Sequence, residues 1–479
     1  MQSLLFFIIF LEGYVVLASE LVAIRQMTPV AGTGTDIIAI IIAAVLMPLA
    51  FGYDRGGRYS PPKGKDPETS IRLKLAINFL TAGLFLSLGL SGFFIKYFFT
   101  MLADALPDDT LILQVIIYAA TFLVIPTYLL AQTIPLSLKL LKDGETSKIT
   151  GRVLCYSTFG SFMGSVFTTI ILMMTIGVYN TVIVILAALT LLTLLILPKK
   201  LSLIGSLSLI PLIAGIVLNG PHIKQQSNIF SDNAYNTVQI FDHPDDPSTR
   251  IMALDNAYSA GLRKDYPVFP YIVFIEDTFI LPIENQTEHP KKDILIIGAG
   301  GFTIGLYDTH HNYSYVDIDP KLKEIAEDHF IFKELEPNKT FYPKPIRQFL
   351  NELPEDRKFD LIVLDVFRGR ILPEALTTQE FFGQMKSRLK PNARLAMNLM
   401  ICPNLTDTFS RNIDATVRSI FPSINYFLLG PETFNYDGWK TYARENGFHC
   451  ATNGMYTYFH YPDPPEIYTD NLNRSALDY

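Results

Sequence analysis

Long apolar runs occupy the first 220 positions of this 479-residue chain and end there. A run of about 18 or more apolar residues is long enough to cross a bilayer as a helix. The pattern predicts seven such spans, the last interrupted by glycine and proline, at residues 3–24, 36–53, 75–99, 111–134, 153–176, 178–198 and 201–219. The first run lacks the basic flank and cleavage site of a signal peptide, so we expect it to be retained. Residues 1–220 are therefore predicted to form a transmembrane helical bundle.

Short strands and turns replace the apolar runs beyond residue 228. Two strand-like segments, 237–241 and 250–254, flank a turn-rich stretch and predict a β-hairpin. Apolar strands then alternate with helical segments, the strands at 293–297, 314–318, 361–364 and 394–399 and the helices at 321–330 and 378–389. This alternation is typical of a doubly wound, mostly parallel sheet. We predict a β-hairpin subdomain at 221–262 and an α/β Rossmann-like, methyltransferase-type domain at 263–479.

Basic residues gather in alternate connections between the predicted spans. They are concentrated at 55–74, 139–152 and 199–200, whereas acidic residues dominate 104–109. The positive-inside rule places the basic connections in the cytoplasm of an integral protein of the inner cell membrane. We expect 201–219 to be a true span, which puts residues 221–479 outside the cytoplasm. If that segment is re-entrant or interfacial, the polar part stays inside.

The charge and the cysteines of the polar part argue against nucleic-acid binding and against a metal site. Residues 1–220 carry 14 basic and 11 acidic side chains, so most of the 46 acidic residues lie beyond them. An acidic domain disfavours nucleic acid as a partner. None of the three cysteines is in a CxxC pair, and we expect no metal site. In an oxidising compartment Cys402 and Cys450 could form a disulfide.

A glycine turn follows the first strand of the predicted parallel sheet. Gly298 and Gly300 come directly after the apolar strand 293–297 and permit close approach of a ligand, and we expect a helix to start there. Asp317 ends the next strand, where a carboxylate can accept hydrogen bonds from ribose hydroxyls. Thr303 replaces the third glycine of the dinucleotide pattern, which favours an adenosyl group over NAD.

Asp365 ends another inner strand and is expected at the same edge of the sheet. A carboxylate in that position can orient an incoming amine or accept its proton. The alternative is a structural aspartate that caps a helix or pairs with a cation.

The order of these segments resembles that of the spermidine and spermine synthases, the aminopropyltransferases. Ser231-Asp-Asn-Ala-Tyr-Asn-Thr-Val is similar to the entry strand of that family, Leu254-Asp255 to its L-D-G turn and Pro270-Tyr271 to its Y-H-E tyrosine. Asp317-Ile-Asp319 is similar to its E-I-D, Leu364-Asp365 to its D-x-x-D-P and Leu376-Thr-Thr-Gln-Glu-Phe-Phe to its L-F-T-x-E-F-Y. The apolar half resembles membrane-fused homologues at Glu20, Arg25, Gly32, Pro126-Thr127, Pro135 and from Gly151-Arg152 to Gly164.

The resemblance implies a site for decarboxylated S-adenosylmethionine as co-substrate, with no permanently bound cofactor. It assigns the nucleoside to Gly298, Gly300, Gly301, Asp317 and Asp319, the catalytic positions to Asp365, Tyr271 and Tyr235, and the amine substrate to Asp255, Ser259 and Arg368. The expected partners are the lipid bilayer, a nucleoside and an amine, with a homodimer as a further option and no nucleic acid.

Several family positions differ in this chain. Gly301 stands where the family has the aspartate that holds the amine of the aminopropyl group, and Arg368 stands where it has the second aspartate of D-x-x-D-P. Ser259, Ile272 and Pro345 replace the glutamine after L-D-G, the histidine of Y-H-E and an adenine-contacting aspartate. An arginine repels a cationic amine at short range.

Three functions follow from these observations. The first is a membrane-bound aminopropyltransferase in which Asp365 acts on the amine. The second is a related transferase that uses intact S-adenosylmethionine or another ligand with a carboxylate or phosphate, received by Arg368 and Arg370. The third is a non-catalytic domain that senses a ligand or is coupled to transport by the bundle.

Overall fold

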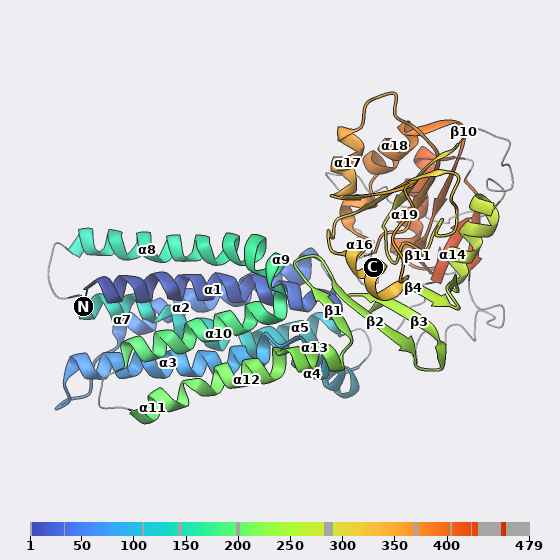
Figure 1. Cartoon of the computed structure of the whole chain (residues 1–479). Helices are drawn as coiled ribbons and strands as arrows, with labels where there is room; N and C mark the ends of the chain where they lie inside the picture. Colours follow the sequence, from blue (N-terminus) through green and yellow to red (C-terminus); the bar gives the residue numbers. More distant parts are fainter. Residues whose placement is uncertain are drawn as a thin grey trace. The chain divides into compact units, whose positions relative to one another are not determined.

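The computed structural model describes residues 2–32, 34–107, 110–141, 146–197, 202–281, 291–367, 372–402, 405–422, 424–429 and 452–456. The chain divides into two compact units, Met1–Ala234 and Tyr235–Tyr479. The first is helical and the second contains the sheets (Figure 1). Arg368, Arg370 and Cys450 lie outside the described residues. Cys402 is disulfide-bonded and Cys155 is free.

The first unit consists of helices with a short strand at its end. Its elements are α1 (Gln2–Ala31), α2 (Thr35–Arg58), α3 (Pro67–Gly89), α4 (Gly92–Ala105), α5 (Leu111–Ala119), η1 (Ala120–Val124), α6 (Ile125–Ala131), α7 (Thr133–Leu140), α8 (Thr146–Phe167), η2 (Thr168–Leu172), α9 (Met173–Thr175), α10 (Gly177–Ile196), α11 (Ser202–Leu207), α12 (Leu209–Asn219), α13 (Pro221–Gln226) and β1 (Ile229–Asp232).

Seven helical segments among the described residues are long and apolar enough to cross a membrane. Their number agrees with the seven predicted spans. The third runs over Pro67–Gly89 and not over 75–99 as predicted. Asp66 caps its start and Ser91 caps the separate helix α4, so local hydrogen bonding divides an apolar run that looks continuous in the sequence. Apolar side chains such as Met47, Phe51 and Ile170 are exposed, as expected of a surface that faces lipid.

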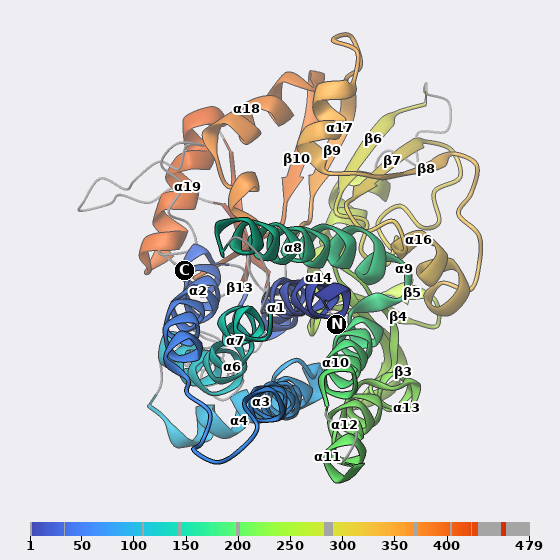
Figure 2. The ribbon, with the colours of Figure 1, turned by 90° about the vertical axis from the view of Figure 1, so that its left-hand side faces the viewer.

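Helix α1 lies in the middle of the bundle and contacts α8, α10, α2 and α7 (Figure 2). Its packing against α8 is closest at two glycines of α8. A Cβ at Gly160 would lie 2.0 Å from the Phe10 carbonyl oxygen, and one at Gly164 would lie 2.3 Å from that of Tyr14. Small residues at such positions let helix backbones approach closely in apolar surroundings.

The second unit begins with an antiparallel sheet and continues with a parallel one. The elements are β2 (Thr237–His243), β3 (Asp246–Leu254), β4 (Ala257–Arg263), β5 (Tyr266–Pro267), α14 (Pro270–Ile275), η3 (Glu276–Ile280), β6 (Asp293–Ile297), β7 (Asn312–Asp317), α16 (Leu322–Ile325), η4 (Ala326–Phe330), β8 (Lys339–Pro343), α17 (Ile346–Glu352), β9 (Phe359–Leu364), η5 (Glu374–Leu376), α18 (Gln379–Ser387), β10 (Leu389–Met397), β11 (Leu399–Ile401), α19 (Thr408–Ile420), β12 (Tyr426–Leu429) and β13 (Thr452–Tyr456).

Strands β2 to β5 pair in sequence order and are antiparallel, so the predicted hairpin is part of a larger meander. The parallel sheet has the order β10-β9-β6-β7-β8. Alternate strand residues face two apolar cores. Ile294 and Ile296 face the antiparallel sheet, whereas Leu295 and Ile297 face α17, α18 and α19. This is the doubly wound arrangement of Rossmann-like domains.

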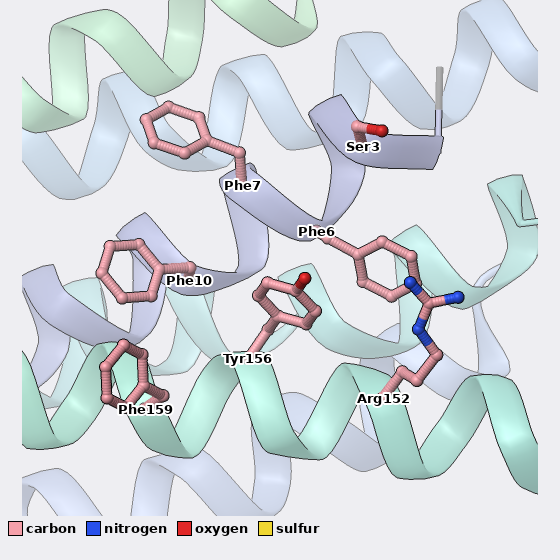
Figure 3. Close-up of a pocket in the computed structure, with 7 residues that line it drawn as sticks. All are labelled: Ser3, Phe6, Phe7, Phe10, Arg152, Tyr156 and Phe159. Carbon is pink, nitrogen blue, oxygen red and sulfur yellow. The ribbon is translucent and has the colours of Figure 1, made fainter.

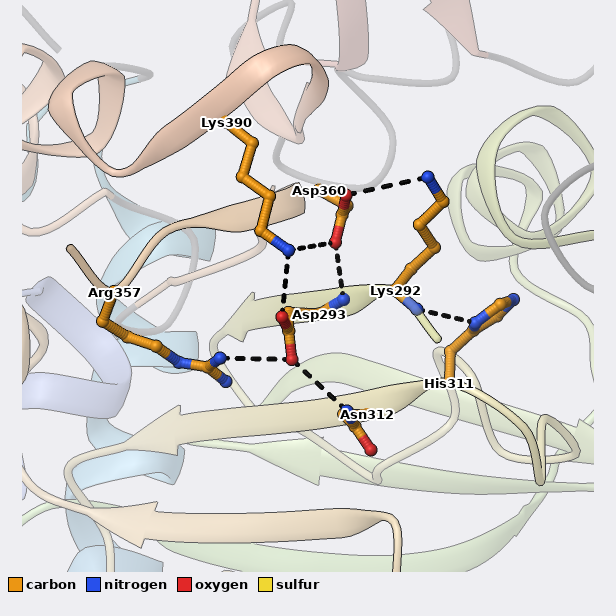
Figure 4. A network of polar contacts seen from close by, with 7 residues as sticks. All are labelled: Lys292, Asp293, His311, Asn312, Arg357, Asp360 and Lys390. Atoms are coloured by element: carbon orange, nitrogen blue, oxygen red, sulfur yellow. Dashed lines mark hydrogen bonds and ion pairs between the residues drawn. The ribbon is translucent and has the colours of Figure 1, made fainter. Parts of the chain in front are cut away.

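An ion-pair network lies at the amino ends of the parallel strands (Figure 4). Lys390 Nζ lies 3.0 Å from Asp293 and 2.7 Å from Asp360, and Arg357 lies 3.2 Å from Asp293. Burial by itself would raise the pKa of Asp293, but the bonds from Lys390 and Arg357 lower it overall. The network joins β6, β9 and β10 at this edge, and ligands of such sheets bind at the opposite, carboxyl edge.

Candidate functional site

The strand order changes direction between β6 and β9. In open parallel sheets, ligands bind outside the carboxyl ends of the strands at such a switch point. Gly298 follows β6 and Asp365 follows β9 there. The ladder bonds continue into these residues, because Gly298 N donates to Val316 O at 2.9 Å and Asp365 N donates to Ile297 O at 2.8 Å. Strand pairing therefore brings the glycine turn and the predicted catalytic carboxylate together.

The turn after β6 requires glycine. Gly298 has φ +92°, and a Cβ there would lie 1.9 Å from the Asp365 carbonyl oxygen, closer than any real contact. Gly300 has φ +48° and lies against Ser259, whose Oγ would be 2.9 Å from a Cβ. Phe302, fully buried, is also left-handed at φ +57°. Such strained backbone is typical of ligand-binding turns.

No helix starts after this turn, contrary to the prediction. Residues 298–311, all of which are described, form turns and bends. The left-handed conformations of Phe302 and of Gly305, at φ +71°, are incompatible with a continuing α-helix. A pyrophosphate normally sits on the helix N-terminus at this place. Because no helix begins after Gly298, the turn favours an adenosyl group over a dinucleotide. This agrees with the loss of the third glycine of the dinucleotide pattern.

Asp317 is the last residue of β7 and is held by backbone groups. Its carboxylate accepts hydrogen bonds from Ala299 N at 3.0 Å and Asp319 N at 3.1 Å. Burial raises the pKa of Asp317 to about 6, although these bonds favour the charged form. Asp319 is fully buried and accepts from Asn236 Nδ2 at 3.3 Å and from Lys321 N at 3.0 Å. Asp317 thus lies at the glycine turn, whereas Asp319 makes structural hydrogen bonds inside the domain.

Asp365 is held by side chains. Asn398 Nδ2 donates to its Oδ1 at 2.8 Å, and the Tyr271 hydroxyl interacts with the same carboxylate. Burial raises the pKa of Asp365 to about 6. Burial and the neighbouring Asp365 raise the pKa of Tyr271 well above its ordinary value, so this phenol stays protonated. Its hydroxyl also lies 2.9 Å from Ser259 O, to which it donates.

The antiparallel sheet supplies the remaining predicted residues. Asp255 and Asn256, at φ +47° and +64°, form the two-residue turn between β3 and β4. Asp255 Oδ1 accepts from Thr237 N at 2.9 Å, so it joins this turn to the start of β2. Tyr235 lies in the bend just before β2 and is partly buried. The structure therefore gives Asp255 a local structural contact and brings Ser259 to the glycine turn.

At Gly301 there is no room for a side chain. A Cβ would lie 2.5 Å from Phe330 Cε1 and 2.7 Å from Ala260 Cβ. The spermidine synthases have an aspartate at this position. Here the packing of Ala260 in β4 against Phe330 in η4 fills the space that such a side chain would need.

Two residues of the site were not predicted. Asn398 directly follows β10, just as Asp365 directly follows β9. The position of Asn398 after an apolar strand was therefore the sequence signal that could have identified it. Asn236, which donates a hydrogen bond to Asp319, is the sixth residue of the segment that resembles the entry strand, and that resemblance was the available signal.

Comparison with known proteins gives partial matches. No protein-family model matches the chain. It is 33% identical over 154 residues to a polyamine aminopropyltransferase of Vibrio vulnificus, an alignment that covers 31% of this chain and 50% of that protein. It is 27% identical over 230 residues to an N-terminal histidine N-methyltransferase of Emericella nidulans, covering 43% of this chain and 40% of that protein. The chain thus spans half or less of the curated relatives that it matches.

Solved structures that match include two spermidine synthases. A probable spermidine synthase from Corynebacterium glutamicum has 17% identity and a TM-score of 0.37, covering 50% of this chain and 95% of that one. A spermidine synthase in complex with a transition-state analogue has 15% identity and a TM-score of 0.33, covering 51% and 82%. The described residues include seven long apolar helices, and part of the chain is similar in sequence to a polyamine aminopropyltransferase.

Proposed function

We propose that the second unit binds an adenosyl sulfonium donor and transfers an alkyl group from it to a nitrogen nucleophile. The observation that carries this proposal is the meeting of Gly298 and Asp365 at the switch point of the sheet. Asp317, at the adjoining strand end, is the proposed ribose ligand, with Gly300 next to the nucleoside. Two carboxylates in a weakly solvated site also favour a cationic sulfonium.

Asp365 is the group proposed to act on the acceptor. The nitrogen lone pair attacks the carbon next to sulfur, the carbon–sulfur bond breaks with its electrons remaining on sulfur, and a neutral thioether leaves. The nitrogen proton passes to the ionised Asp365 carboxylate. Asn398 holds this carboxylate in place through its hydrogen bond, so the chain contributes mainly alignment and proton acceptance.

Aminopropyl transfer from decarboxylated S-adenosylmethionine to an amine is the first candidate. The relative of higher identity is a polyamine aminopropyltransferase, and its similarity supports this reaction. Tyr271 and Tyr235 would then border the amine.

Methyl transfer from intact S-adenosylmethionine is the second candidate, and two observations favour it. Packing around Gly301 leaves no space for the carboxylate that would hold the ammonium of an aminopropyl group. One relative is named as an N-terminal histidine N-methyltransferase. An N-terminal α-amine or an imidazole of a peptide would then be the acceptor class.

The experiment supplies the purified full chain with one donor at a time and detects products by mass spectrometry. Decarboxylated S-adenosylmethionine is tested with diamines and intact S-adenosylmethionine with a peptide that begins with histidine. A mass gain of one aminopropyl or one methyl group, lost in Asp365→Asn, supports the respective reaction. If neither donor is consumed with either acceptor, the transferase proposal is wrong and the ligand-sensing alternative replaces it.

For the whole chain, we propose an integral membrane protein whose second unit is extracytoplasmic. Seven long apolar helices and the alternation of basic connections support this orientation. The disulfide-bonded state of Cys402 is compatible with an oxidising compartment.

A further inference from the structure

A groove on the surface of the helical unit lies between the N-terminal part of α1 and residues 152–159 of α8 (Figure 3). It has a volume of about 340 Å³. Seven residues line it: Ser3, Phe6, Phe7 and Phe10 from α1, and Arg152, Tyr156 and Phe159 from α8. Phe7, Tyr156 and Phe159 are 44%, 40% and 56% exposed, so the groove is open to whatever surrounds the bundle.

The sequence of α8 accounts for the position of the groove. Residues 152, 156, 160 and 164 follow at intervals of four and share one face of the helix. Gly160 and Gly164 bring this face into backbone contact with α1. Toward the start of α8, the large side chains of Tyr156 and Arg152 take the place of glycine. The Phe6 and Tyr156 rings stack there, with centroids 5.0 Å apart.

The groove is polar at one end and aromatic at the other. Ser3 and Arg152 lie toward the start of α1, and Phe10 and Phe159 lie farther along it (Figure 3). The Arg152 guanidinium is 4.7 Å from the centroid of the Phe6 ring. Within the described part of the chain, Arg152 makes no hydrogen bond or ion pair. Arg152 is therefore a cation beside an apolar surface, and no carboxylate of the described residues neutralises its charge.

We propose that this groove binds one anionic phospholipid, with its phosphate on Arg152 and Ser3 and an acyl chain along Phe7, Phe10 and Phe159. An arginine fork matches phosphate oxygens in geometry and charge. Ser3 and Phe10 are seven positions apart, which corresponds to about 10 Å along the helix axis, the distance from a headgroup to the upper part of its acyl chain. The positive end of the α1 dipole lies at the same place. The basic connection 139–152, which ends at Arg152, would enrich anionic lipid nearby.

The test is native mass spectrometry of the full chain in detergent with equal amounts of phosphatidylglycerol and phosphatidylcholine that carry the same acyl chains. The wild-type chain should retain phosphatidylglycerol roughly tenfold better, the value of one charge-assisted contact. Arg152→Gln should remove the preference. Arg58→Gln is the matched control and should keep it, because Arg58 is exposed and already paired with Asp54 at 2.9 Å. Phe159→Ala should weaken retention of both lipids and leave their ratio unchanged.

Circular dichroism spectra that match wild type show that the variants fold. For folded variants, each of the following outcomes counts against the proposal. An undiminished preference in Arg152→Gln overturns the proposal. Displacement of the lipid by inorganic phosphate assigns Arg152 to a free anion and also overturns it. A lipid-free wild-type dimer that dissociates in Arg152→Gln assigns the groove to a second copy of the chain.

Discussion

At the scale of single residues, the two carboxylates of the candidate site are held in different ways. Among the described residues, the Asp317 carboxylate accepts hydrogen bonds from the backbone N–H groups of Ala299 and Asp319, and Ala299 cannot move without altering the glycine turn. Asp365 contacts the side chains of Asn398 and Tyr271, which can adjust when a proton arrives. We therefore propose that Asp317 binds the nucleoside and that Asp365 accepts the proton.

Asp365→Asn tests this division. The amide keeps the shape of the carboxylate but cannot accept a proton, so turnover should fall by about 10²–10⁴-fold. Donor affinity should change little. The control is Asp356→Asn, the same change at an exposed loop position. Product formation by mass spectrometry measures turnover, and an Asp365→Asn variant as active as the control would exclude Asp365 from the reaction.

The pH dependence provides a second test at this scale. Asp365 accepts a proton only when it is ionised, and burial raises its pKa to about 6. The rate at subsaturating acceptor should therefore rise as the pH increases through about 6 and then level off. The bond from Asn398 favours the ionised form and lowers this pKa, so Asn398→Ala should move the inflection to higher pH. An unchanged inflection in Asn398→Ala would mean that another group controls the profile.

Sequence patterns were most informative for residues at strand ends. Gly298, Asp317 and Asp365 were predicted because each follows or ends an apolar strand, and parallel pairing brings such positions to one edge. Ser259 lies in the antiparallel sheet and Asn236 lies just before its strand β2, and their proximity to Gly300 and Asp319 depends on how the two sheets pack. Packing of that kind leaves no periodic signal in the sequence.

At the scale of elements, the segment between β6 and β7 differs most from its prediction. The helix expected after Gly298 is replaced by turns because three residues adopt left-handed conformations. The third helix likewise begins and ends closer to the N-terminus than predicted. Asp66 caps the start of α3, and Ser91 caps the start of the separate helix α4. Hydrophobicity predicted which elements exist, and local hydrogen bonding decided their bounds.

Gly301→Ala tests the packing between β4 and η4. Its methyl group would clash with Phe330 and Ala260, so the variant should lose about 1–3 kcal/mol of stability. Gly383→Ala is the matched control, because nothing lies within 4 Å of a Cβ there and α18 should gain about 0.5–1 kcal/mol. Thermal unfolding of the solubilised chain measures both. A Gly301→Ala variant as stable as wild type would show that this position has room for the family aspartate.

At the scale of the whole molecule, the side of the membrane on which the second unit is expected depends on the number of spans. Seven crossings would place the two ends of the bundle on opposite sides of a membrane, and by the positive-inside rule the basic connections would place its start inside. The second unit should then lie outside the cytoplasm.

Cysteine labelling on intact cells tests this orientation. In a Cys155→Ser background, single cysteines at the exposed positions Asp104 and Glu355 should both react with a membrane-impermeant maleimide. Labelling at position 104 without labelling at 355 would place the second unit in the cytoplasm. A cysteine at the exposed Lys63 is the internal control and should stay unlabelled until the cells are opened.

The most direct test of the central claim is calorimetric titration of the purified full chain with methylthioadenosine, decarboxylated S-adenosylmethionine and intact S-adenosylmethionine. We predict that at least one of them binds at one site per chain. Asp317→Ala should weaken this binding by about tenfold or more, the loss expected for charge-assisted bonds to ribose. Asp365→Asn should retain it. Absence of binding by all three nucleosides, or equal affinity in Asp317→Ala and wild type, would contradict an adenosyl site at the switch point of the parallel sheet.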